Sequence, residues 1–135
     1  MITQDNQAKI VKMPGSIPTG FETNPTVPLY NTVTGYDRLV QNGSNVALTS
    51  CDECSLNPRT SVGITADNKL IMMVVDGRQT GFSEGLTMTE TANFMMSYGA
   101  VDAIDLGGGG SSTMVMNFYG GALNGQVFNS PSAGS

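Results

Sequence analysis

Two stretches of the sequence combine side chains and backbone suited to chemistry on an anionic group. The first is VVDGRQTGFSEG, in which Asp76 and Arg78 follow an apolar run and precede a polar, glycine-rich loop. Residues two apart in an extended chain point to the same side. This pair is therefore either a surface ion pair that contributes little stability or a carboxylate beside a guanidinium that holds an anionic substrate. Arg59, which precedes the neighbouring apolar run, is placed to converge on the same region.

The second stretch is LGGGGSSTM, where the glycines 107–110 are followed by Ser111 and Ser112. Consecutive glycines direct several backbone N–H groups into one concavity, which suits a phosphate. The run is not a Walker A loop, because no lysine follows it and a strand rather than a helix comes next. It is not a dinucleotide fingerprint in a βαβ unit either. On its own, the run is either a tight structural turn or a loop that faces a ligand.

The absence of histidine narrows the chemistry further. It excludes a Ser-His-Asp triad, a Cys-His pair and a histidine metal site, so any general acid or base is a carboxylate, lysine, tyrosine or cysteine. Cys51 and Cys54 in CDEC have the spacing of an ordinary loop turn, of a local disulfide, or of half a metal or redox site. Asp52 and Glu53 between them disfavour a reactive thiolate. We predict no metal and no cofactor.

Composition excludes two classes of partner. The 135 residues carry a net charge of −5 with only six scattered cations, so no basic patch for nucleic acid can form. No apolar run approaches the ~18 residues of a membrane span. The first residues lack the basic and apolar regions of a signal peptide, which leaves the location open.

Turn signals and periodicity predict the elements that position these stretches. Residues 1–30 contain four prolines within 14–28 and are predicted to be an irregular N-terminal arm, with one domain over 31–135. Residues 36–48 form a short hairpin with Asn42-Gly43 as its turn. Residues 60–65 and 70–77 form an antiparallel hairpin, and the second strand is apolar enough to be covered on both faces.

A helix over about 88–98 follows, with Thr87 and Glu90 as a capping box and Gly99 as its end. Its apolar stripe contains three methionines, which we interpret as core. Strands over 101–106 and 113–118 enclose the glycine loop, and two further turn signals follow, at residues 120–121 and 124–125. The order of strands, helix and strands predicts an α+β fold, with a mixed or antiparallel sheet and the helix on one face.

Three linked motifs, NPRTSVGIT, VVDGRQTGFSEGLTMTETANFM and GAVDAIDLGGGGSSTMVMN, resemble the phosphodiester glycosidase family in order and spacing. This family includes the uncovering N-acetylglucosamine-1-phosphodiester α-N-acetylglucosaminidases. The resemblance implies a hydrolase that splits a sugar from a sugar-1-phosphodiester. The phosphate of such a substrate leaves with little protonation. The site therefore needs cations or N–H groups around the phosphate and a carboxylate near the anomeric carbon of the sugar. By this resemblance the candidate phosphate-binding residues are Arg59, Arg78, Gly108, Gly109, Gly110, Ser111 and Ser112, with Thr113 orienting the loop.

The candidate catalytic carboxylates are Asp76 and Asp105, and here the chain departs from the family pattern. Asp105 stands where asparagine is usual, and Gly107 stands where the family has an aspartate. Asp105 lies about 6–7 Å up the strand, too far to substitute directly. We therefore expect binding features to transfer better than catalysis. The rival hypothesis is a non-catalytic self-assembling or carbohydrate-binding module on the same fold.

The ends of the sequence suggest self-association. Compared with the family, the domain is expected to be incomplete at both ends, with no final strand after Phe128 and an open ladder among the strands of 101–118. Residues 8–13 alternate apolar and polar side chains and are the predicted donor strand. This strand either folds back on its own sheet or inserts into the next molecule, and the second arrangement gives homo-oligomers or filaments through sheet edges. The expected ligand is a sugar phosphate or glycan. The resemblance favours a secreted, cell-surface or phage-particle location.

Overall fold

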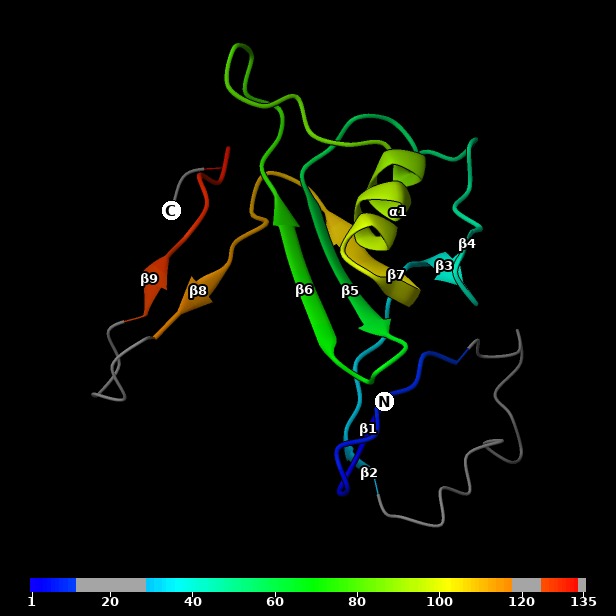
Figure 1. The fold of residues 1–135 in the computed structure, drawn as a ribbon. Helices are drawn as coiled ribbons and strands as arrows, with labels where there is room; N and C mark the ends of the chain where they lie inside the picture. The colour runs from blue at the N-terminus through cyan, green and yellow to red at the C-terminus, as the bar shows by residue number, and fades with distance from the viewer. Residues whose placement is uncertain (12–28, 118–124, 134–135) are drawn as a thin grey trace.

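The computed structural model describes residues 1–11, 29–117 and 125–133 (Figure 1). Its elements, in chain order, are β1 (Ile2–Thr3), β2 (Leu29–Asn31), β3 (Asp37–Gln41), β4 (Ser44–Asn45), β5 (Arg59–Thr65), β6 (Leu70–Val75), α1 (Met88–Ser97), β7 (Ala100–Gly108), β8 (Val115–Met116) and β9 (Gln126–Val127). Within these ranges no helix has the length and apolarity needed to cross a bilayer.

Five strands form one antiparallel sheet in the order β4-β3-β7-β5-β6, with α1 packed on it. The predicted α+β fold with an antiparallel sheet and one main helix is confirmed. Both predicted hairpins are present: β3 and β4 join at Asn42-Gly43, and β5 and β6 pair from Arg59↔Val75 to Ile64↔Leu70. β8 pairs with β9 in a separate two-stranded ladder, and the turn signals at 120–121 and 124 lie outside the described residues.

The helix begins and ends where the sequence predicts. The Thr87 hydroxyl accepts from the Glu90 N–H, and the Glu90 carboxylate accepts from the Thr87 N–H, which completes the capping box. Gly99 follows the last turn with φ 90°. Met88 and Met95 are fully buried on the face that meets β3 and β7. The core lies between this helix face and the sheet, with Leu39, Val40 and Ala103 on the sheet side.

The prediction that the second strand of the 60–77 hairpin is covered on both faces is wrong. β6 is an edge strand whose only described ladder is with β5. Leu70 is 48% exposed and Met72 is 65% exposed. The reason is that α1 packs over β3, β4 and β7 and leaves the outer face of β6 without a covering element among the described residues.

The prediction of an open ladder among the strands of 101–118 is wrong for β7, the long strand of that region. β7 lies between β3 and β5, so it is central, and the edges of the sheet are β4 and β6.

At the start of the chain, β1 pairs with β2, and Ala8 bridges Ile2. The Ala8 N–H donates to the Asn68 side chain at 3.0 Å, so the first residues lie against the β5–β6 turn.

Candidate functional site

The glycine loop lines an open pocket at the end of β7. The strand continues through Gly108, two residues beyond the predicted strand end. The pocket has a volume of about 340 Å³ and is lined by Thr60, Leu106, Gly107, Gly108, Ser111, Ser112 and Thr113. Gly108 has to be glycine, because a Cβ there would lie 2.2 Å from the Pro58 carbonyl oxygen. The strand pairing between β5 and β7 therefore brings the Asn57-Pro58 segment directly against the loop.

Some backbone N–H groups of the glycine loop donate hydrogen bonds within the protein, and others do not. The Gly109 N–H donates to the Pro58 carbonyl at 3.2 Å, and the Ser112 N–H donates to the Gly109 carbonyl at 3.0 Å. Between these two bonds, the N–H groups of Gly110 and Ser111 have no hydrogen-bond acceptor among the described residues. Ser111 lines the pocket and Gly110 precedes this residue, and successive unpaired N–H groups are an arrangement that can bind an anion.

Asp105 lies beneath the loop rather than among the residues that line the pocket. Its side chain is 1% exposed, and its carboxylate accepts from the Gly107 N–H at 3.1 Å and from the Ser61 hydroxyl at 3.3 Å. Burial raises the pKa of Asp105, against the positive charge of Arg59, which lowers it. The cross-strand neighbour Asp37 adds a smaller upward contribution to this pKa. In this geometry Asp105 holds the start of the loop.

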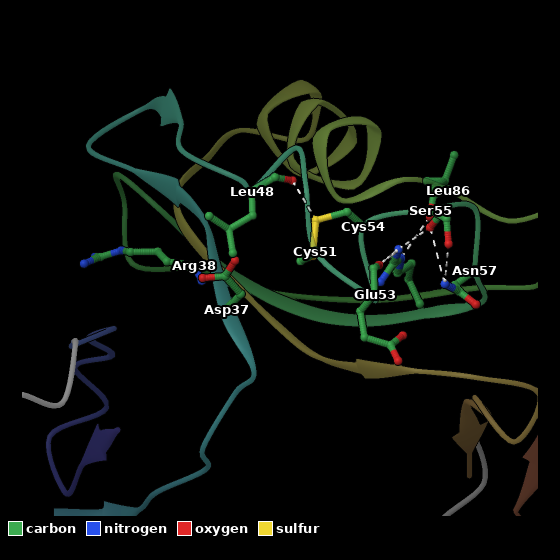
Figure 2. The surroundings of a disulfide bond; sticks show 10 residues. Asp37, Arg38, Leu48, Cys51, Glu53, Cys54, Ser55, Asn57 and Leu86 are labelled. Atoms are coloured by element: carbon green, nitrogen blue, oxygen red, sulfur yellow. Dashed lines mark hydrogen bonds between the residues drawn. A yellow bond between two sulfur atoms is a disulfide. The ribbon is translucent and has the colours of Figure 1, made fainter. Parts of the chain in front are cut away.

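Arg59 is fully buried and donates to backbone carbonyls. Its Nε donates to the Leu86 carbonyl at 2.9 Å, and its Nη2 donates to those of Glu53 and Ser55, each at 2.6 Å. Nη1 is buried and has no partner within the described part of the chain. Burial lowers the pKa of the guanidinium, while Asp105 and Glu53 raise it. Figure 2 shows these carbonyl-bearing residues gathered beside the disulfide loop.

The two cysteines form a disulfide, Cys51–Cys54, which is one of the three interpretations that their spacing allows. The bond closes a tight turn in which the Cys54 N–H donates to the Cys51 carbonyl at 3.1 Å. Glu53, whose carbonyl binds Arg59, lies inside this turn (Figure 2). The disulfide thus fixes one of the acceptors that hold the buried guanidinium. In the described ranges no group of three or more Cys, Asp or Glu side chains has the geometry of a metal site.

Asp76 and Arg78 do not pair with each other. The expectation that they share one side of an extended chain is wrong, because β6 ends at Val75 and Arg78 adopts φ 57°. Arg78 donates twice to the Asn57 Oδ1, from Nε at 3.1 Å and from Nη2 at 2.7 Å. The Asp76 carboxylate accepts from the Asn129 amide at 2.7 Å and from the Ser130 N–H at 2.9 Å. The surface ion pair considered for these two residues is therefore not formed.

The sequence analysis missed two asparagines that organise this region. Asn57 orients Arg78, and its backbone exchanges hydrogen bonds with Leu86. Asn129 connects Asp76 to the end of the glycine loop. Asparagines in loops rich in Gly, Ser and Pro commonly bond to nearby backbone, and that composition around both residues was the available signal.

Comparison with known proteins identifies the family and the fold. The family model for phosphodiester glycosidases matches residues 2–135. The human and mouse N-acetylglucosamine-1-phosphodiester alpha-N-acetylglucosaminidases are 28% and 30% identical over 127 residues, which is 79% of this chain and 24% of each relative. The chain therefore spans about a quarter of the length of these relatives. A zebrafish structure of the corresponding catalytic domain, auto-inhibited by its pro-peptide, aligns with a TM-score of 0.62 at 24% identity, over 81% of this chain and 38% of that one.

Proposed function

Because this chain belongs to the phosphodiester glycosidase family, we propose that its glycine-loop pocket binds the phosphate of a sugar-1-phosphodiester and supports release of the sugar. The observation that carries this proposal is the pair of successive unpaired N–H groups of Gly110 and Ser111, of which Ser111 lines a pocket of about 340 Å³. The curated relatives are named for N-acetylglucosamine-1-phosphodiesters, so N-acetylglucosamine is the first sugar to test.

The reaction suits a site of this kind. A phosphate monoester leaves with little need for protonation, because its second pKa is about 6. Backbone N–H groups that face the developing negative charge stabilise it without moving. In this proposal Gly108 to Ser112 surround the phosphate and Thr113, whose hydroxyl donates to the Ser111 carbonyl at 2.9 Å, orients the loop. Asp76 is the carboxylate offered to the anomeric carbon.

In this proposal the two arginines and Asp105 have different roles, and only Arg78 contacts the substrate. Arg78 is exposed, and two of its donors are spent on Asn57, so its remaining Nη1 is the group offered to the phosphate. Arg59 is buried and donates to backbone carbonyls, so its positive charge acts on the phosphate without direct contact. Asp105 supports Gly107 and does not react.

We further propose that hydrolysis is weak, because Gly107 carries no carboxylate where the family pattern has one. A side chain at this position would enter open space, since nothing lies within 4 Å of an added Cβ, but φ is +114° and strains any L residue. The experiment compares Gly107→Asp with Gly107→Ala, which shares the strain and lacks the carboxylate. Hydrolysis of an N-acetylglucosamine-1-phosphodiester should be faster in Gly107→Asp than in Gly107→Ala and the unmodified chain. Equal rates in the two variants, or robust turnover by the unmodified chain, would contradict the proposal of weak catalysis.

A second candidate function is self-association without catalysis, and β6 is the observation that favours it. This edge strand has six residues and no charge or proline, whereas exposed edges are usually protected by such residues. Of the predicted donor segment 8–13, Ala8 already bonds to Ile2 and Asn68, and residues 12–13 lie outside the described ranges. We therefore propose pairing of β6 with β6 of a second copy. Light scattering should give a dimer mass for the unmodified chain and a monomer for Met72→Lys; a monomer in both would exclude this function.

We also propose a secreted or cell-surface location. The Cys51–Cys54 disulfide supports this location, because disulfides persist in oxidising compartments and are rare in reducing ones.

A further inference from the structure

The segment 129–133 lies against the glycine loop and the end of β6. The Ala133 N–H donates to the Gly110 carbonyl at 2.9 Å, and the Ser130 N–H donates to the Asp76 carboxylate at 2.9 Å. The segment therefore contacts the middle of the glycine loop and the end of β6. The glycine loop and the end of β6 are therefore joined through this segment.

Asn129 makes the central connection of this segment. Its Nδ2 donates to the Asp76 Oδ1 and to the Ser112 carbonyl, both at 2.7 Å. Its Oδ1 accepts from the Met114 N–H at 2.8 Å. One amide thus ties the end of β6, the end of the glycine loop and the residue before β8. Only a side chain with two donors and an acceptor at one end fits these three partners, and among short side chains that is asparagine.

We propose that Asn129 is a positioning residue, which fixes the Asp76 carboxylate relative to the glycine loop and keeps it away from the anion-binding N–H groups. Both Asp76 oxygens are occupied by N–H donors, from Asn129 and Ser130. A carboxylate released from these donors would be free to compete with the phosphate for the N–H groups of Gly110 and Ser111, because a carboxylate accepts from N–H donors as a phosphate does. Asn129 therefore holds the carboxylate ready for the sugar and leaves the loop open for the phosphate.

The inference rests on the proposed function for its ligand, but the hydrogen-bond connection is testable without one. The protection factor of an amide is its exchange rate in an unstructured peptide divided by its observed rate. In the unmodified chain, the protection factors of the Met114 and Ser130 amides should be at least about tenfold larger than that of the Ser111 amide. Asn129→Ala should speed exchange at Met114 and Ser130 by about tenfold or more, the equivalent of losing one bond to a charged group. Asn31→Ala, which changes an exposed asparagine in β2, a strand that pairs with β1 and contributes no residue to the pocket lining, is the matched control and should change neither rate.

The second readout is titration with N-acetylglucosamine 1-phosphate, followed through the Ser111 amide by NMR. We expect about tenfold weaker binding in Asn129→Ala and unchanged binding in Asn31→Ala. If Asn129→Ala does not fold, Asn129→Asp replaces it, because it keeps the shape and loses both donors. The introduced carboxylate also keeps the oxygen that accepts from the Met114 N–H, so in this variant the faster exchange is expected at Ser130 alone. Unchanged exchange in the Asn129 variant, or faster exchange with unchanged affinity, overturns the positioning role. If the unmodified chain binds no sugar phosphate, the proposed function fails, and the exchange rates at Met114 and Ser130 still decide the role of Asn129.

Discussion

Replacing Arg59 tests whether this arginine serves the fold or grips the phosphate directly. Arg59→Met keeps the apolar stem and removes the guanidinium, which leaves the carbonyls of Glu53, Ser55 and Leu86 without their donor. Three charge-assisted bonds are lost from a fully buried side chain, and the Asp105 carboxylate loses its nearby cation. Removing one partner of such a buried charged cluster costs about 3–5 kcal/mol of the free energy of unfolding. Because small domains have only about 5–15 kcal/mol in total, the loss is large but measurable.

Urea denaturation measures this loss. With an m-value of about 2 kcal/mol/M, a loss of about 4 kcal/mol lowers the midpoint by about 2 M. The control is Lys69→Met, which also removes a cation, but from a solvent-exposed salt bridge with Asp67, and it should leave the midpoint unchanged. If Arg59→Met shifts the midpoint no more than Lys69→Met does, while binding of a sugar phosphate disappears, the assignment of Arg59 to the carbonyls is refuted and direct contact with the phosphate is favoured.

Three further predictions concern stability. Burial raises the pKa of the Asp105 carboxyl group above its unfolded value of about 3.9. As pH rises through about 3.9, the unfolded chain therefore loses the Asp105 proton before the folded chain does. The contribution of Asp105 to stability decreases until the pH has also passed the folded pKa. The free energy of unfolding of Asp105→Asn relative to the unmodified chain should therefore increase between about pH 3 and pH 7, as measured by urea titration at both values, and a constant difference would contradict it. Replacing Cys51 and Cys54 together by serine should cost about 2 kcal/mol, because the closed loop is short, and the same loss should follow treatment with a reductant. Thr87→Ala should cost about 1 kcal/mol by removing the helix cap, seen as a lower melting temperature with an unchanged m-value, and no loss would mean that the cap is replaced by water.

Local signals in the sequence predicted the local structure well. Asn42-Gly43 specified the first hairpin, and Thr87 with Glu90 specified the start of the helix, because in each case the partners are at most a few residues apart. The resemblance to the family, carried by three ordered motifs, is confirmed by the family model over 2–135.

Long-range arrangement was harder to predict, for physical reasons. An apolar run such as LIMMVV has the same composition at an edge as in the centre of a sheet, so the edge position of β6 depends on where α1 packs. Arginine is usually exposed, and the burial of Arg59 depends on three carbonyls that the disulfide loop and Leu86 bring together. Asn129 and Asp76 are 53 residues apart, and no local pattern connects them. The assignments of the candidate site residues to binding and catalysis remain predictions.

The segment between β6 and α1 is held at its base and exposed at its tip, where Gln79 and Ser83 exchange backbone hydrogen bonds at 2.9 Å. Gly77 and Gly85 both approach the backbone of Asn57, and the Leu86 and Asn57 backbones exchange hydrogen bonds at 3.2 and 3.0 Å. Phe82, at the far end, is 67% exposed. The entropy of closing a loop grows slowly with its length, so residues inserted near Phe82 add little cost, while Asp76 and Arg78 stay fixed at the base. This tip is therefore where the chain can acquire new recognition residues over evolution, or an engineered tag, without rebuilding the pocket.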